Sequence, residues 1–225
     1  MITTLTFDLD DTLWSTRDVI GRAETELFEF MHAEFPVFTE HHSVESFAEV
    51  RQQLIQADPR RVHDLRQLRL DALRLEIARL GHPNPDPLAS QASAHFQRAR
   101  QAVRFWPGVL DTLDRLARDF QLIALTNGTT DIMASPAGAF FTQGYRADQF
   151  DAGKPEPDMF VHAMQKHGFS ADQVVHVGDN WEHDVLAPHQ MGWKTAWIGA
   201  GQPPGQQATW VLESVNELPE KLTQL

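Results

Sequence analysis

The amino-acid sequence predicts an α/β fold, with a Rossmann-like, doubly wound parallel sheet as its core and an all-helical cap domain inserted into it. Two observations lead to this prediction. Short apolar segments alternate with segments of helical spacing at the start and in the second half of the chain, a pattern typical of a parallel sheet with helices on both faces. Between these parts, the chain keeps helical spacing over a long stretch. We therefore expect a core of residues 1–15 and 104–225 and a helical cap of residues 16–103.

Four apolar, partly β-branched segments are expected to form the main strands of the core. They are Ile2–Leu9, Gln121–Thr126, Val174–Val177 and Thr195–Ile198. The first three lead into the polar residues Asp8, Thr126 and Asp179. In parallel sheets, ligands bind beyond the carboxyl ends of the strands. We therefore expect these three side chains to lie together, although they are far apart in the sequence.

Helices are expected between these strands and throughout the insertion. In the core they begin near Val109, run from Pro157 to His167, and run from about Asp184 to Met191. In the insertion, Asp58-Pro59 and the segment Gly81–Pro87 are expected to separate helices. The tail is expected to form a loop through Pro203-Pro204-Gly205, followed by a short closing strand and helix.

Composition restricts the classes of function and partner. The formal net charge is −12 and the pI is near 5.3, so a nucleic-acid polymer is not an expected partner. Cysteine is absent, which excludes thiolate metal ligands and cysteine nucleophiles. No segment approaches the roughly 20 apolar residues of a membrane span, and no basic leader precedes an apolar stretch. We expect a cytoplasmic protein without a membrane partner, a monomer or a weak homodimer.

Asp8 and Asp10 are the first candidates for chemistry. They stand two residues apart at the end of an extended segment, a spacing that points strand side chains to the same side. One carboxylate could attack phosphorus, while the other protonates the leaving oxygen and later activates water. An isolated Asp-x-Asp pair after a strand is more often a helix cap or a solvated loop, so this interpretation depends on the rest of the chain.

A phosphoryl-transfer site also needs hydroxyl and amide donors and a cation. Thr126 could supply its hydroxyl and Asn127 its backbone amide to phosphate oxygens, although Asn127-Gly128 is also an ordinary turn sequence. Lys154 is the candidate cation. It stands within Gly153–Pro157, where prolines restrict the backbone and can direct the amine inward.

Carboxylates for a metal ion follow the third strand. Asp179 comes directly after Gly178, and Asp184 follows five residues later. Carboxylate oxygens are the ligands that a hard Mg²⁺ ion prefers. The alternative is that these residues cap a helix, a role that suits Asp184 better than Asp179.

These four segments, in this order, resemble the motifs of the haloacid dehalogenase superfamily of phosphohydrolases. The segments are Asp8–Leu13, Thr126-Asn127, Lys154-Pro155 and Gly178–Asp184. The resemblance implies that Asp8 is the nucleophile and Asp10 the general acid and base. It also implies phosphoryl binding by Thr126, Asn127 and Lys154. A Mg²⁺ ion would be bound by Asp8, the Asp10 backbone carbonyl and Asp179. Asp184, with Asn180 as a weaker candidate, would support these ligands without contacting the ion.

The helical insertion stands where this superfamily has a mobile cap that closes over the site and selects the substrate. Several segments most resemble the riboflavin-pathway phosphatases, which act on flavin mononucleotide and on 5-amino-6-(5-phosphoribitylamino)uracil. These are Leu5–Trp14, Arg17, Val19-Ile20, Val62–Arg66 and His176–Asp179. We therefore expect a Mg²⁺-dependent phosphomonoester hydrolase that forms a phosphoaspartate. Its substrate would be a small phosphorylated metabolite, with flavin mononucleotide or a riboflavin precursor as candidates. Trp14, Arg17 and Arg66 are candidate substrate contacts.

Four alternatives stay open at this stage. The substrate could be a nucleotide or a sugar phosphate, because no motif encodes selectivity. A phosphomutase would keep both Asp8 and Asp10. A 2-haloacid dehalogenase is disfavoured, because a halide leaves without a proton and needs no second carboxylate. A non-catalytic binding protein would be expected to have lost a chemical residue, and every expected one is present.

Overall fold

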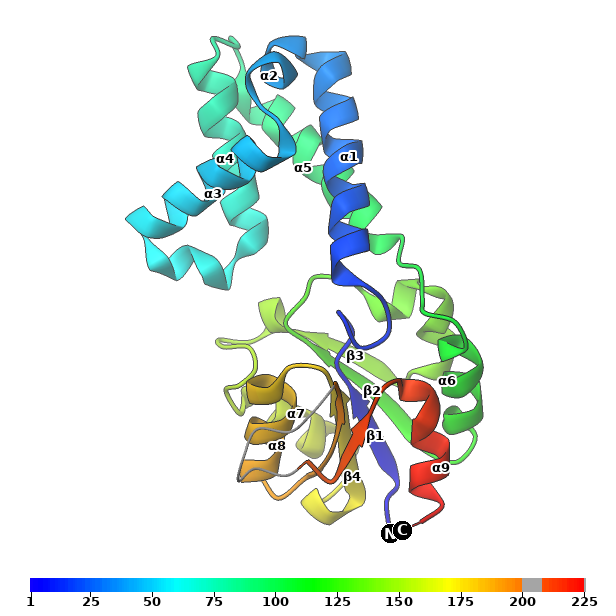
Figure 1. Ribbon diagram of the computed structural model, residues 1–225. Helices are drawn as coiled ribbons and strands as arrows, with labels where there is room; N and C mark the ends of the chain where they lie inside the picture. The colour runs from blue at the N-terminus through cyan, green and yellow to red at the C-terminus, as the bar shows by residue number, and fades with distance from the viewer. Residues whose placement is uncertain (200–207, 225) are drawn as a thin grey trace. The chain divides into compact units, whose positions relative to one another are not determined.

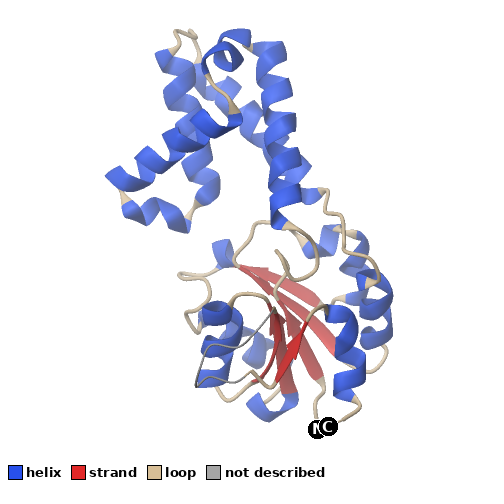
Figure 2. Ribbon diagram, in the orientation of Figure 1, coloured by secondary structure: helices blue, strands red, loops and turns tan. Residues whose placement is uncertain are grey.

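The chain forms two compact units. The structure is a computed structural model that describes residues 1–199 and 208–224. One unit, here the core unit, joins Met1–Thr16 with Val103–Leu225. The other, here the helical unit, is Arg17–Ala102. Figure 2 shows that the sheet belongs to the core unit and that the helical unit contains helices and loops.

The core unit is built on a six-stranded parallel sheet with the order β3-β2-β1-β4-β5-β6. Its strands are β1 (Thr4–Phe7), β2 (Gln121–Thr126), β3 (Gln143–Arg146), β4 (Val174–Gly178), β5 (Lys194–Ile198) and β6 (Trp210–Leu212). The chain builds outward from β1 through β2 to β3, returns to the other side of β1, and builds outward again through β4 to β6. The direction therefore reverses at β1, and doubly wound sheets bind ligands at this switch point.

Helices cover both faces of the sheet. Figure 1 shows α6 (Val109–Ala117) and α9 (Leu218–Leu222) on one face, and α7 (Asp158–His167) and α8 (Ala187–Gln190) on the other. Every residue of β1 and β4 is buried between these layers. Short 3-10 turns occur at Ile132–Ala134, Pro136–Phe140, Ala147–Gln149, Ala171–Gln173 and Val215–Glu217.

Five helices and one short turn make up the insertion. They are α1 (Thr16–Glu34), α2 (Pro36–His41), α3 (Val44–Ala57), a 3-10 turn (Pro59–His63), α4 (Leu65–Arg79) and α5 (Pro85–Gln101). Apolar residues at helical spacing place one side of each helix in a shared core. Its largest fully buried members are Phe38, Phe47, Leu27, Met31, Leu73 and Ile77.

A charged cluster is buried among these helices. Arg51 of α3 and Arg69 of α4 donate hydrogen bonds to the same Oε1 atom of Glu24 on α1, over 3.0 and 2.8 Å. The Arg69 guanidinium also lies 3.5 Å from the centre of the Phe96 ring. Burial lowers the pKa of Arg69 to about 10, although the Glu24 charge opposes this shift. Glu24 therefore neutralises part of the positive charge that the folded helical unit encloses.

The predicted fold class is confirmed, and three details of the sequence interpretation need comment. The edge strand β3 was not expected, because Gln143–Arg146 contains a glycine and only Tyr145 of this strand is buried. The helix expected from about Asp184 to Met191 is present, but it begins three residues earlier, and its first part, Trp181–Leu186, is a π-helical turn that α8 follows. The closing strand and helix are present as β6 and α9, while the loop expected at Pro203–Gly205 lies outside the described residues.

No helix in the described part of the chain combines the length and apolar character needed to cross a membrane.

Candidate active site

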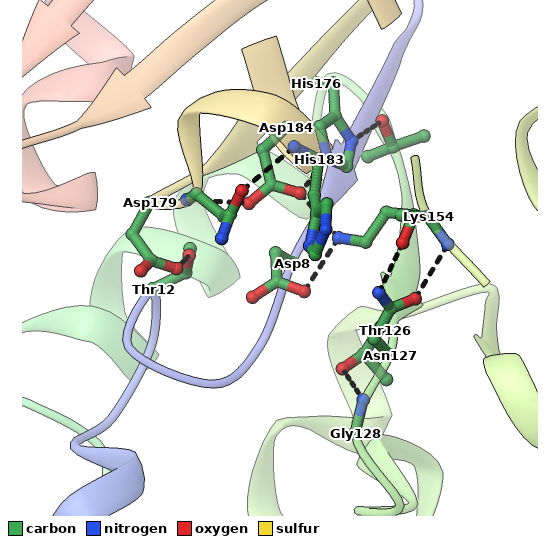
Figure 3. A network of polar contacts seen from close by, with 12 residues as sticks. Asp8, Thr12, Thr126, Asn127, Gly128, Lys154, His176, Asp179, His183 and Asp184 are labelled. Atoms are coloured by element: carbon green, nitrogen blue, oxygen red, sulfur yellow. Dashed lines mark hydrogen bonds and ion pairs between the residues drawn. The ribbon is translucent and has the colours of Figure 1, made fainter. Parts of the chain in front are cut away.

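The polar residues at the carboxyl ends of β1, β2 and β4 gather at one edge of the sheet. Figure 3 shows Asp8, Thr126 and Asp179 around a common space, together with Lys154 and Asp184. Asp8 is held at the end of β1 by its backbone N–H, which donates to the Val177 carbonyl of β4 over 2.8 Å. The parallel topology thus brings together residues separated by most of the chain, as the strand ends predicted.

Lys154 lies at the centre of this group. Its Nζ atom is 2.8 Å from Asp8 Oδ1 and 2.6 Å from Asp184 Oδ1. Its side chain is only 1% exposed. An ammonium group has three N–H donors, so one remains for a phosphoryl oxygen. Charge-assisted hydrogen bonds of this length are strong and directional, and they fix the amine beside Asp8.

The Asn127 side chain holds the loop that carries Lys154. Asn127 Nδ2 donates to the Lys154 carbonyl over 2.7 Å, and the Lys154 backbone N–H donates to Asn127 Oδ1 over 2.8 Å. A Cβ atom at Gly153 would lie 2.5 Å from that Oδ1, so this pairing requires glycine. One N–H of the side-chain amide and its oxygen are therefore committed to the Lys154 loop, and the backbone N–H of Asn127 stays the predicted donor to a phosphate.

Thr126 presents its hydroxyl at the end of β2. The side chain is buried, and its Oγ1 accepts a hydrogen bond from the Gly128 N–H over 2.9 Å. The oxygen is therefore fixed, and the hydroxyl proton can be donated to an anion.

Asp184 reaches the site through the π-helical turn. Its Oδ1 accepts from Lys154 and from His176 Nε2, the latter over 3.1 Å, and its Oδ2 accepts from the Asn180 N–H over 3.0 Å. A Cβ atom at Gly178 would lie 2.3 Å from Asp184 Cγ, so glycine is required where β4 ends. Asp184 does not cap the turn. The side chain of Asn180 does this, accepting from the His183 N–H over 3.0 Å.

The charges in this cluster are strongly coupled. Burial raises the pKa of Asp8 well above its usual range, with Lys154 opposing the shift. Burial and repulsion from Asp184 raise the pKa of Asp179 to about 6. For Asp184, burial acts in the same direction, but Lys154 and His176 outweigh it and hold its pKa well below the usual value. Burial would lower the pKa of Lys154, but Asp184 and Asp8 keep it above its usual value.

This arrangement fits a hard divalent cation. Carboxylate oxygens of Asp8, Asp179 and Asp184 lie within 4.8 Å of one another. Such oxygens are the donors that Mg²⁺ prefers, and a cation would stabilise the two carboxylates whose pKa values are raised. Both oxygens of Asp184 already accept from protein donors. Asp8 and Asp179 are therefore the better candidates for direct metal ligands, and Asp184 is a candidate for a supporting role without contact to the ion.

Asp10 occupies a separate position in the loop after β1. The strand ends at Phe7, so strand alternation does not determine where the Asp8 and Asp10 side chains point, which corrects the basis of that prediction. Asp10 Oδ1 instead accepts a hydrogen bond from Trp14 Nε1 over 2.9 Å. Trp14 is completely buried, so the expectation that it contacts substrate is wrong. Its indole contacts Asp10.

The other candidate substrate contacts lie in the helical unit. Arg17 is on α1 and Arg66 is on α4, and both are exposed. Their roles stay predictions.

Sequence reasoning missed several residues that support the site. Thr12 Oγ1 donates to Asp179 Oδ1 over 3.2 Å, and Trp197 Nε1 donates to the Asp179 carbonyl over 2.8 Å. His176 belongs to one of the segments that resemble the riboflavin-pathway phosphatases, but no role was predicted for it. One signal was available for it: a histidine among valines in a fully apolar strand must find buried hydrogen-bond partners.

Comparisons with known proteins identify the family. The family model of haloacid dehalogenase-like hydrolases matches residues 2–192. The 5-amino-6-(5-phospho-D-ribitylamino)uracil phosphatase YigB of Escherichia coli is 31% identical over 199 residues, covering 88% of this chain and 83% of that protein. The glyceraldehyde 3-phosphate phosphatase of Methanopyrus kandleri is 24% identical, with 90% and 86% covered. The chain belongs to the haloacid dehalogenase-like hydrolases.

A solved structure supports the same fold over the full length. The 2-haloacid dehalogenase from Pseudomonas syringae pv. Tomato DC3000 superposes with a TM-score of 0.89 at 30% identity, covering 100% of this chain and 99% of that one. The superfamily resemblance inferred from the four motifs is confirmed, and so is the closer resemblance to riboflavin-pathway phosphatases. The prediction of an enzyme of the haloacid dehalogenase phosphatase type is likewise confirmed.

Proposed function

We propose that the protein is a Mg²⁺-dependent phosphomonoester hydrolase that forms a phosphoaspartate on Asp8 while acting on a small phosphorylated metabolite. The observation that carries this proposal is the contact of Lys154 Nζ with both Asp8 and Asp184, beside Asp179. A buried carboxylate next to a fixed ammonium group and a cation site is what attack on a phosphate dianion requires, because the incoming negative charge must be offset.

The reaction consists of two displacements. The Asp8 carboxylate attacks phosphorus while the bond from phosphorus to the ester oxygen breaks, and Asp10 gives its proton to the leaving alcohol. Asp10 then takes a proton from the water that attacks phosphorus and releases Asp8. Throughout, the Thr126 hydroxyl, the Asn127 backbone N–H and the Lys154 amine donate to the phosphoryl oxygens.

Mg²⁺ would be held by Asp8, the Asp10 backbone carbonyl and Asp179. When bound, it supplies positive charge that orients the phosphate and offsets the repulsion between the phosphate and Asp8. Asp184 contributes indirectly, because its carboxylate is committed to Lys154, His176 and the Asn180 N–H.

Residues 16–103, which include the helical unit, would act as a cap that selects the substrate. Arg17 and Arg66 are its candidate contacts to the substrate. The resemblance to YigB supports flavin mononucleotide or a riboflavin precursor as the substrate, and the second relative acts by its name on a triose phosphate. Nucleotide or sugar-phosphate hydrolysis and phosphomutase activity are the alternatives within the same chemistry.

A dehalogenase activity is the second candidate, because the superposed structure carries that name. Asp10 argues against it. A departing alkoxide needs a proton and a departing halide does not, and here a carboxylate is held at this position by the Trp14 indole over 2.9 Å. A carboxylate held in this way is placed to transfer a proton, and this chemistry favours phosphate esters as substrates.

The test is phosphate release from a panel of flavin mononucleotide, nucleoside monophosphates and sugar phosphates, with Mg²⁺ or with a chelator. Chloride release from a 2-chloro acid is measured in parallel. We expect Mg²⁺-dependent phosphate release that falls to background in Asp8→Asn, led by the flavin. Release led by another ester would retain the mechanism and replace the substrate. Chloride release without phosphate release would overturn the proposal.

A further inference from the structure

His176 lies in the middle of β4 and is completely buried. Its Nδ1 is 2.8 Å from Thr6 Oγ1 of the neighbouring strand β1, and its Nε2 is 3.1 Å from Asp184 Oδ1. Figure 3 shows the His176 ring beside Asp184. Both ring nitrogens are thus satisfied in a position where an unpaired polar atom would be costly.

The partners determine which nitrogen carries the proton. Lys154 keeps Asp184 ionised, so this carboxylate can only accept hydrogen bonds. Nε2 must therefore be the donor, and Nδ1 must accept from the Thr6 hydroxyl. Burial also lowers the pKa of His176. The imidazole is accordingly neutral, with the proton on Nε2 because Asp184 can only accept, and the Thr6 hydroxyl donates to Nδ1.

Asp184 connects this histidine to the reaction. Its Oδ1 receives both His176 Nε2 and Lys154 Nζ, and the Asn180 N–H fixes its Oδ2. Three donors from three segments thereby restrain the carboxylate in position and rotation. Without the histidine donor, Oδ1 would be held by the flexible Lys154 side chain alone, and that is the side chain whose amine must stay beside Asp8.

We propose that His176 is a positioning residue for phosphoryl transfer: as a neutral donor to Asp184, it fixes the carboxylate that holds Lys154 Nζ 2.8 Å from Asp8. This inference rests on the proposed function above and assigns a role to a residue that does not touch substrate. A neutral donor suits this place better than a second cation, because it orders Asp184 without competing with Lys154 for its charge.

The test compares two replacements of similar volume. His176→Gln can still donate from its terminal amide, whereas His176→Met cannot donate at all. Loss of such a supporting partner typically lowers activity about 10- to 100-fold. We expect His176→Met to lower kcat by about that factor with little change in KM, because Lys154 acts mainly as negative charge moves to Asp8. We expect His176→Gln to recover most of the loss. A purely structural role would give no such recovery.

Thr6→Val provides a second variant if His176→Met fails to fold. It removes the hydroxyl that donates to His176 Nδ1 and helps to hold the ring in its orientation, and it leaves the His176 side chain itself unchanged. We expect kcat to fall several-fold with KM unchanged. Thermal denaturation and circular dichroism establish folding for all variants.

The two proposals fail in different ways. If the wild-type protein releases no phosphate from any ester, the proposed function fails. If the wild-type protein is active, Asp8→Asn is inactive, and His176→Met keeps kcat within about twofold, the inference about His176 is overturned. Equal loss in the Met and Gln variants would also overturn it, because the donor would then not be what matters. So would an unchanged kcat in Thr6→Val.

Discussion

Trp14 Nε1 donates to Asp10 Oδ1 over 2.9 Å, across a tight turn of the backbone. In this turn the Leu13 N–H donates to the Leu9 carbonyl over 2.9 Å, and Asp11 adopts a left-handed φ of 59°. Phe105 packs edge-on against the Trp14 ring, with 5.3 Å between ring centres. The carboxylate that would transfer protons is therefore oriented by a side chain that the core holds rigidly.

Replacing Trp14 by Phe should lower activity more than stability. The ring and its packing on Phe105 are kept, while the hydrogen bond to the Asp10 carboxylate is lost. We expect kcat to fall about tenfold, the effect of one hydrogen bond to a charged group. Trp106→Phe is the matched control, because the Trp106 side chain is on the surface of the same unit. Equal kcat in both variants would show that the indole N–H does not orient Asp10.

Asp10→Asn should separate metal binding from proton transfer. The proposed ligand is the Asp10 backbone carbonyl, which the substitution leaves in place, whereas the amide cannot act as an acid or base. We expect kcat to fall by about 100-fold or more, with the Mg²⁺ affinity from calorimetric titration almost unchanged. If Mg²⁺ affinity falls together with kcat, the Asp10 side chain also contributes to metal binding, and the proposed separation of the two roles is wrong.

Gly153→Ala should disrupt the pairing between Asn127 and the Lys154 backbone. The new Cβ would lie 2.5 Å from Asn127 Oδ1, so the loop must shift and move the Lys154 amine with it. We expect kcat/KM to fall about 10- to 100-fold, as for other displaced supporting partners. Gly21→Ala is the control: it stands on the exposed side of α1 with no atom within 4 Å of the new Cβ. That variant should be fully active and slightly more stable, since alanine favours helix.

The strand ends and motif order could be predicted because they depend on local patterns. Apolar runs identify β1, β2 and β4, and parallel topology then dictates that their carboxyl ends meet. The predicted candidates Asp8, Thr126 and Asp179 follow from this rule. The edge strand β3 could not be recognised in the same way, because Gly144 interrupts it and its exposed side carries no apolar pattern.

Hydrogen-bond partners are the part that sequence patterns do not specify. Nothing in the spacing of Trp14 and Asp10 shows that the indole turns back to the carboxylate, since this depends on the left-handed Asp11. Likewise, the π-helical turn that brings Asp184 to Lys154 differs from the ordinary helix that periodicity predicts. Both features become visible only when backbone conformation is known.

Asp179 should make the metal-free protein depend on pH. Its pKa of about 6 in the folded state is above its usual value, mainly because of burial. The stability that protonated Asp179 contributes is present below pH of about 4 and is lost as the pH rises through about 6. Without Mg²⁺, Asp179→Asn should therefore be more stable than the wild-type protein at pH 8, by about 1–2 kcal/mol. The difference between the two proteins should disappear at a pH of about 4, where the stability contributed by protonated Asp179 is fully present.

Adding Mg²⁺ should reverse this order, because the ion stabilises only the protein that can bind it. Urea denaturation at pH 8 and at a pH of about 4, each with and without Mg²⁺, measures the free energy of unfolding under the four conditions. If the wild-type protein is more stable than Asp179→Asn at pH 8 without Mg²⁺, the raised pKa of Asp179 is contradicted.

The buried charges of the helical unit should affect stability. Glu24 is 3% exposed and accepts from both Arg51 and Arg69. Glu24→Gln removes the only negative charge that the described contacts give these two guanidinium groups, and unpaired buried charge is strongly destabilising. We expect the free energy of unfolding to fall by about 3 kcal/mol. Glu29→Gln is the matched control, because Glu29 is exposed on the same helix, and its effect should stay within about 0.5 kcal/mol. Urea denaturation followed by circular dichroism distinguishes the two, and equal effects would mean that Arg51 and Arg69 are stabilised chiefly by their aromatic neighbours, Phe47 and Phe96.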